Sequence, residues 1–203
     1  HGNGLPGHKR WLTNGGLKVP FILYAPPKYK HLVSNLESKT VNQMVGFVDF
    51  APTVLELVGA EIPEMMEGRN FLGDDVEPKE FIYGYRDRAD DCYDVARSVF
   101  DGRYLYVRHF MPHVPYFQNA VIFNKEGSYE EIHRLRKVGN LPEETRQMFE
   151  EKPVEQLFDL ANDPFEQDNI INDSDMKKRI DLLRNKIKDR KSTRLNSSHR
   201  YVS

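Results

Sequence analysis

The apolar positions in the first part of the chain gather in a few short segments. Residues 17–25 form a nearly continuous apolar run that two prolines close, and a run of this length beside helix breakers predicts a buried strand. Further on, Asp49 precedes a stretch that extends to Val58, with Pro52 near its start and Gly59 after its end. An N-cap residue, a first-turn proline and a C-terminal glycine together predict a helix.

Short runs rich in Tyr, Phe and Val follow in the second half, and they predict the strands of one antiparallel sheet. Asp101 and Gly102 separate the second run from the third. An Asp-Gly pair between alternating strands is a strong hairpin signal, and we expect both turn residues at positive φ. The predicted strands are residues 81–85, 97–100, 103–107 and 156–160.

Three segments with helical periodicity accompany these strands. Residues 128–138 and 142–150 predict two helices, and residues 173–188 predict a third, amphipathic one that lies on one face of the sheet. Its apolar side chains are Met176, Ile180, Leu183 and Ile187. The order of elements predicts an α/β portion over residues 1–77, followed from Pro78 by an antiparallel sheet with helices.

The composition agrees with a packed chain and narrows its class. Apolar residues are 39% and aromatic residues 11% of the 203 positions, which is enough for a core. The formal net charge of −2 argues against an electrostatic nucleic-acid binder. No apolar run approaches the ~20 residues of a membrane-spanning helix. The single cysteine, Cys92, excludes an internal disulfide and a multi-cysteine zinc cluster.

Residues 189–203 differ from the rest because they have no apolar period. Their sequence resembles one reading frame of a common short-read sequencing adapter, and the alternative is a polar disordered tail. Both interpretations predict a non-native or disordered tail without packed structure.

Four sets of motifs in one order resemble the C-terminal portion of a sulfatase. The first joins His1-Gly2 to Lys9 and to a glycine followed by Val19-Pro20, and the second comprises residues 48–59. The other two are Ile62-Pro63 with residues 67–69, and residues 155–160 with the Asp-Pro turn after them. The eight-residue step from His1 to Lys9 and residues 84–88 are most similar to the arylsulfatase and heparan N-sulfatase-like branch.

The resemblance implies the end of the sulfatase catalytic α/β domain over 1–77. A C-terminal α+β subdomain with a four-stranded antiparallel sheet and a terminal helix follows over 78–188. His1 stands where the family has a calcium ligand, and Lys9 stands where it has a cation on the sulfate. A fixed cation and a hard metal ion stabilise the charge that builds up as a sulfate ester is cleaved. The family is periplasmic, secreted or lysosomal, and we expect a periplasmic or secreted protein.

The chain departs from the family pattern at the nucleophile. Sulfatases convert a Cys or Ser within Cys/Ser-x-Pro-x-Arg to formylglycine, whereas Cys92 is followed by Tyr93-Asp94. We therefore expect a sulfatase portion that depends on formylglycine and one Ca²⁺ only when intact, and that is inactive by itself. The expected partner is a sulfated saccharide or an aryl sulfate.

Charged and imidazole side chains around the predicted hairpin are candidates for binding the rest of the substrate. Loops on a rigid sheet commonly carry such contacts. The alternative is that Arg86 and Arg88 only pair with nearby aspartates on the surface. The candidate residues are Arg86, Asp87, Arg88, His109 and His113.

Two other functions fit parts of the sequence. A phosphodiesterase-like hydrolase of the same superfamily shares the fold, and the upstream nucleophile would distinguish it. A non-catalytic carbohydrate-binding module would use the aromatic-rich second half alone, and a glycan-binding screen of residues 78–188 would distinguish it.

Overall fold

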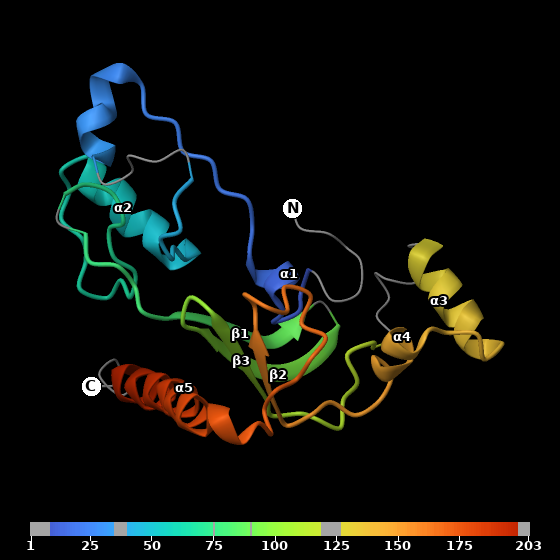
Figure 1. The fold of residues 1–203 in the computed structure, drawn as a ribbon. Helices are drawn as coiled ribbons and strands as arrows, with labels where there is room; N and C mark the ends of the chain where they lie inside the picture. The colour runs from blue at the N-terminus through green and yellow to red at the C-terminus, as the bar shows by residue number, and fades with distance from the viewer. Residues whose placement is uncertain (1–8, 35–39, 75, 90, 119–126, 199–203) are drawn as a thin grey trace. The chain divides into compact units, whose positions relative to one another are not determined.

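The computed structural model describes residues 9–34, 40–74, 76–89, 91–118 and 127–198, with side chains to Arg190 (Figure 1). The chain forms two compact units: unit 1 comprises His1–Val19 and Tyr83–Ser203, and unit 2 comprises Pro20–Ile82. This division differs from the expected one, in which residues 1–77 form one domain. Leu12 shows why the first residues group with the sheet, since it is buried in a cluster with side chains of unit 1 strands.

Unit 1 is built on a four-stranded antiparallel sheet, which confirms the prediction. Its strands are β1 (Ile82–Ala89), β2 (Cys92–Phe100), β3 (Tyr104–His109) and β4 (Glu155–Asp159). They neighbour one another in chain order. Phe100 pairs with Leu105 across β2 and β3, and Leu105 pairs with Phe158 across β3 and β4. Inward side chains of the three strands from β2 to β4 form the core.

The hairpin between β2 and β3 is present, but its turn differs from the prediction. Gly102 has φ +98°, whereas Asp101 is not among the described residues with positive φ. The Asp101 carboxylate instead accepts the backbone N–H groups of Arg103 and Tyr104, at 3.0 and 2.7 Å. This side-chain bonding holds a three-residue loop in which one glycine supplies the left-handed conformation.

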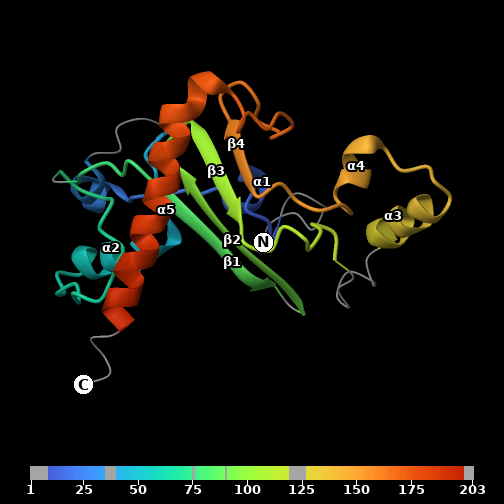
Figure 2. The same ribbon diagram turned by 90° about the horizontal axis from the view of Figure 1, so that it is seen from below.

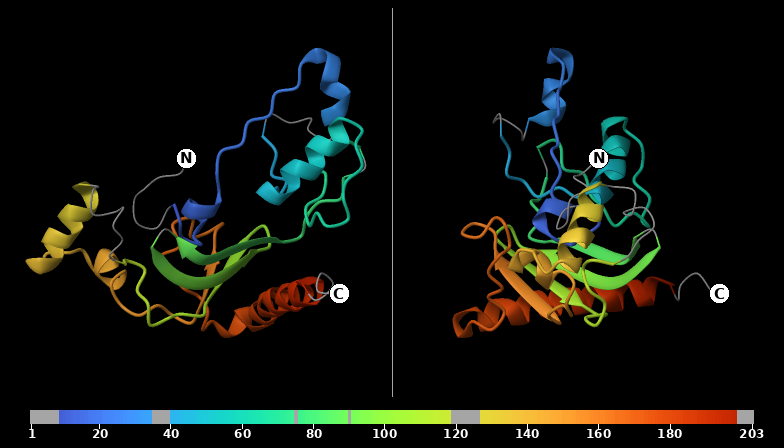
Figure 3. Two further views of the ribbon diagram at one scale, coloured as in Figure 1. Left: turned by 180° about the vertical axis from the view of Figure 1, so that it is seen from behind. Right: turned by 90° about the vertical axis from the view of Figure 1, so that its right-hand side faces the viewer.

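The long helix α5 (Lys177–Ser198) covers one face of the sheet, as Figures 2 and 3 show. It follows the short 3₁₀ helix η4 (Ser174–Met176). Ile180, Leu183 and Ile187 are buried, as the helical spacing predicted. The remaining helices of unit 1 are α1 (Asn14–Leu17), α3 (Gly127–Lys137) and α4 (Glu143–Gln147).

Helix α5 continues past the expected end of native structure. Residues 189–198 are helical, and the Arg190 guanidinium lies 4.5 Å from the centroid of the Tyr83 ring. The residues after Lys188 up to Ser198 include neither glycine nor proline, so nothing in the sequence ends the helix. The expectation of a tail without structure therefore differs from the backbone seen here.

Unit 2 is mainly irregular and contains the 3₁₀ helices η1 (Pro27–Val33) and η2 (Phe47–Asp49) and the helix α2 (Phe50–Leu57). The buried strand predicted over residues 17–25 is wrong, because residues 18–26 have no regular structure and Ile22 is 91% exposed. A strand requires a hydrogen-bonded neighbour, and residues 18–26 have none in the described sheet.

Asp49 precedes α2, but its side chain does not cap the helix as predicted. The buried carboxylate instead accepts from Lys79 Nζ at 2.5 Å and from the backbone N–H of Gly46 at 2.9 Å and of Arg69 at 3.1 Å. The aspartate thus holds together three segments of unit 2. No described helix is both long and apolar enough to cross a membrane.

Candidate functional site

The segment that carries Lys9 is attached to the sheet of unit 1 by aromatic and apolar packing. Arg10 has φ +78°, a conformation that is uncommon outside glycine. Trp11 is buried and stacks on Tyr116, with ring centroids 4.8 Å apart and planes 10° from parallel. Leu12 is buried against Ala96, Leu105 and Val107. These contacts hold Lys9 at one place beside the sheet.

A carboxylate fixes the same segment a few residues later. The backbone N–H of Asn14 donates to both Glu166 oxygens, at 3.0 and 2.9 Å. Glu166 itself has φ +57°. Burial raises the pKa of Glu166 to about 7, and the negative charge of Asp163 adds to this rise, whereas the Asn14 N–H opposes it. Strained backbone is thus present on both sides of this attachment, at Arg10 and Glu166.

The structure separates the candidate residues on β1. The Asp87 carboxylate is exposed and lies 2.6 Å from the Arg97 guanidinium. The Arg88 guanidinium lies 5.1 Å from the centroid of the Tyr93 ring on β2. Both residues therefore lie on the surface of the hairpin. Arg86 differs from both, because its side chain is only 9% exposed.

Arg86 belongs to a buried group of charges. Its Nη1 atom lies 3.6 Å from one oxygen of Asp94, and the Lys152 ammonium contacts the other oxygen of the same carboxylate. The Lys152 side chain is fully buried. Burial lowers the pKa of Lys152, and Asp94 opposes that shift. Asp94 therefore forms ion pairs with two buried cations, and Lys152 is the closer of the two.

His109 is buried beside this group, and His113 is exposed. His109 Nε2 lies 2.9 Å from Gln156 Oε1 and 3.1 Å from the Tyr116 hydroxyl. Burial lowers the pKa of His109, so the ring is neutral at pH 7. His109 contacts Tyr116, on which Trp11 stacks, so it connects to the Lys9 segment through these two rings.

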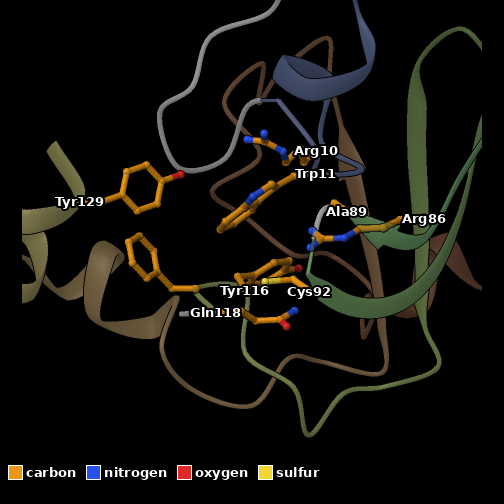
Figure 4. A pocket seen from close by; sticks show the side chains of 9 residues that line it. Arg10, Trp11, Arg86, Ala89, Cys92, Tyr116, Gln118 and Tyr129 are labelled. Atoms are coloured by element: carbon orange, nitrogen blue, oxygen red, sulfur yellow. The ribbon is translucent and has the colours of Figure 1, made fainter. Parts of the chain in front are cut away.

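A small pocket lies where these parts meet (Figure 4). Its volume is about 10 Å³, which is the space of one water molecule. Trp11 and Tyr116 contribute aromatic walls, and Arg10, Arg86 and Gln118 contribute polar groups. The sequence-predicted candidates therefore do not form a single surface cluster. The side chains of Arg86 and His109 are buried in unit 1. Asp87, Arg88 and His113 are exposed to solvent.

His1, the candidate calcium ligand, lies outside the described residues. Within the part of the chain that the structure describes, no group of three or more His, Cys, Asp or Glu side chains is arranged to hold a metal ion.

Comparison with known proteins identifies the family. The family model described as N-sulphoglucosamine sulphohydrolase, C-terminal, matches residues 7–116. The chain belongs to this sulfatase family. The match includes Lys9, the first three strands and Tyr116 of the pocket.

Individual relatives agree with this assignment. An ulvan-active sulfatase from Formosa agariphila is 36% identical over 92% of this chain, and an arylsulfatase from Clostridium perfringens is 24% identical over 91%. This sulfatase chain spans 31% and 30% of the lengths of these two relatives. The solved structure of a 2-O GAG sulfatase matches 81% of this chain and 28% of that one, with a TM-score of 0.52 and 18% identity. That likeness shows a shared fold.

Several residues of the site were not among the sequence candidates. Asp94 precedes the strand predicted from Arg97, so its inward position in β2 could not be read from the pattern. Trp11 and Tyr116 are distant in sequence, and nothing local indicates that they stack. Lys152 carries no signal at all, since a lone lysine is ordinarily exposed.

Proposed function

We propose that the chain is part of a sulfuric ester hydrolase that removes sulfate from a sulfated carbohydrate or an aryl sulfate. The observation that carries this proposal is the family match over residues 7–116, together with 36% identity to an ulvan-active sulfatase. Relatives named for action on ulvan and on aryl sulfates favour a sulfated saccharide or aryl ester as the substrate.

In this proposal Lys9 binds the sulfate group. Its ammonium is a compact positive charge that suits a sulfate oxygen without bidentate geometry. Stacking of Trp11 on Tyr116 and burial of Leu12 hold the segment in place. A cation held before the reaction begins stabilises the charge that develops on the ester oxygens without further rearrangement.

The proposal also gives the intact enzyme a formylglycine and one calcium ion. The described residues fit neither group. They contain no set of three metal-ligating side chains, and the buried Cys92 is not followed by the proline and arginine of the modification motif. We therefore assign no step of the reaction to either group, and His1 remains a predicted calcium ligand.

The exposed candidates keep a predicted role in binding the rest of the substrate. Asp87, Arg88 and His113 are open to solvent on the strands and on the loop after β3. His109 is different, because it is buried and contacts Tyr116 and Gln156. We propose that His109 is a positioning residue that acts through Tyr116.

A chimera tests the function. The present chain would replace the corresponding C-terminal part of the Formosa agariphila sulfatase, and turnover of a chromogenic aryl sulfate and of the matching aryl phosphate would be compared. We expect cleavage of the sulfate, and a loss of roughly 10²–10³-fold in kcat for Lys9→Ala. Lys18→Ala, which removes an exposed lysine of the same unit, should leave turnover unchanged.

Three results would contradict the proposal. Preference for the aryl phosphate would favour the phosphodiesterase alternative, and full turnover in Lys9→Ala would remove Lys9 from the site. Turnover of the aryl sulfate by the purified 203-residue chain alone would overturn its expected inactivity.

A further inference from the structure

The buried charges beside the pocket do not balance. Among the described residues, Asp94 is the one carboxylate paired with Arg86 and with Lys152, and it contacts Lys152 closely while its Arg86 contact is 3.6 Å. Burial lowers the pKa of the neighbouring His109, so this ring is neutral and neither adds to nor offsets the charge of the group. The three charged side chains therefore carry one excess positive charge in the interior. Such a charge is costly unless an anion or a dipole compensates it.

One donor of Arg86 is also unused. The Nε–H group is buried and has no hydrogen-bond partner among the described residues. Buried polar groups of proteins nearly always have such a partner. The side chain is 9% exposed, so bulk water does not satisfy this donor. An oxygen atom of a ligand would supply both the missing acceptor and the missing negative charge.

The pocket beside Arg86 has room for that oxygen. Its volume of about 10 Å³ fits one oxygen atom and excludes a sugar ring. Arg10 and Gln118, which are both partly exposed, also line it, so the pocket reaches the surface. Arg10 follows Lys9 directly in the chain and is held at φ +78°. The pocket is therefore close to the proposed sulfate-binding residue.

We propose that Arg86 binds a second anionic group of the substrate, a carboxylate or a sulfate other than the one that is cleaved. This inference rests on the proposed function for its choice of substrate. The anion inserts one oxygen toward Nε, and the remainder of the sugar lies outside, beside Arg10 and Gln118. A hydroxyl group would satisfy the donor but would leave the excess charge, so a neutral sugar is not the expected ligand.

The experiment follows the Nε–H resonance of Arg86 by NMR in the ¹⁵N-labelled 203-residue chain. The resonance is assigned by its absence from the Arg86→Lys variant. The chain is titrated with sodium glucuronate, sodium sulfate or glucose at constant ionic strength. We expect a saturable shift with one or both anions, with half-saturation at roughly millimolar concentration, and no shift with glucose. A response to glucuronate alone assigns the site to a carboxylate, and a response to sulfate alone assigns it to a sulfate.

Variants separate the pocket from general charge effects. Arg86→Lys keeps the positive charge and removes the Nε donor, and it should weaken anion binding at least ~10-fold by calorimetry. Arg134→Lys makes the same change on the exposed face of α3 and should bind as the wild type does. If Arg86→Lys does not fold, the resonance is assigned in the wild type by triple-resonance connectivities from the Arg86 backbone along its side chain, and the wild-type titration still decides.

The inference would be overturned if neither anion gave a saturable shift of the Arg86 resonance, or if glucose gave a shift as large as the anions do. Binding is measured here without turnover, so an inactive chimera would refute the proposed function and leave this site intact. An active chimera without anion binding at Arg86 would refute this inference alone.

Discussion

Replacing Glu166 by glutamine should change the pH dependence of stability in a defined direction. The pKa of Glu166 is raised from its ordinary 4.5 to about 7, first by burial and then by the charge of Asp163. Because the folded-state pKa is the higher one, the folded chain binds the proton more tightly than the unfolded chain. The associated stability is fully present below pH 4.5 and is lost as the pH rises to about 7.

The size of this effect follows from the shift. A rise from 4.5 to about 7 corresponds to about 3 kcal/mol between the two protonation states. Glu166 is only partly buried, so solvent screening reduces this to roughly 1–2 kcal/mol. Glutamine cannot ionise and keeps one acceptor for the Asn14 N–H. Glu166→Gln should therefore match the wild type near pH 4.5 and exceed it by about 1–2 kcal/mol at pH 8.

Urea unfolding between pH 4.5 and 8 measures this difference. Trp11 is the single tryptophan, and it lies three residues before Asn14, so its fluorescence reports the segment that Glu166 holds. Asp163→Asn should reduce the pH dependence of the wild type, because it removes the neighbouring negative charge. The reasoning would be refuted if the free energy of unfolding differed between the wild type and Glu166→Gln by the same amount at every pH. It would also be refuted if the wild type became the more stable of the two toward pH 8. Tyr116 is the other titratable group that interacts with Glu166, and burial keeps its pKa above this range.

Three further substitutions test the fold, each by urea unfolding at pH 7. Gly102→Val should lose at least ~1 kcal/mol, because Gly102 has φ +98°, whereas Gly127→Ala meets open space and should be near neutral; equal effects would argue against the turn. Leu183→Ala should lower the free energy of unfolding by about 2–5 kcal/mol, because this side chain is fully buried. The control Leu182→Ala should lower it far less, because Leu182 is 40% exposed. Similar losses in the two variants would mean that α5 does not pack on the sheet through the face seen here. Lys152→Met should lose about 1–3 kcal/mol, because Asp94 loses its closer charged partner but keeps Arg86; a neutral result would show that the buried pair is not formed.

Periodicity within single segments predicted most of unit 1. The four strands and the buried face of α5 follow from local alternation and helical spacing, and both depend on residues that are neighbours in sequence. The motifs spread over the chain also predicted the sulfatase family, which the comparisons confirm. The strand over residues 17–25 was wrong because an apolar run shows only that burial would be favourable. It does not show that a neighbouring strand is present to pair with it.

The arrangement of the candidate site was much less accessible from sequence. Arg86 and Arg88 are two residues apart, and only the side chain of the first is buried, against Asp94. His109 ends β3, two residues beyond the predicted strand, and its ring contacts Tyr116 and Gln156. Such contacts join residues that are far apart along the chain, and no local pattern specifies them. The resemblance alone gave Lys9 its predicted role. The structure adds the packing of Trp11 and Leu12, which holds the segment that carries Lys9.

The exposed run of residues 19–24 has a consequence for handling the protein. Phe21, Ile22 and Tyr24 are more than half exposed within a segment of high β-propensity that has no charged residue. Segments of this kind pair readily with copies of themselves and seed aggregates. Pro20 is the only residue in the run that opposes such pairing, because it lacks a backbone donor. A lysine or glutamate at Ile22 is therefore the first change to make when the isolated chain precipitates.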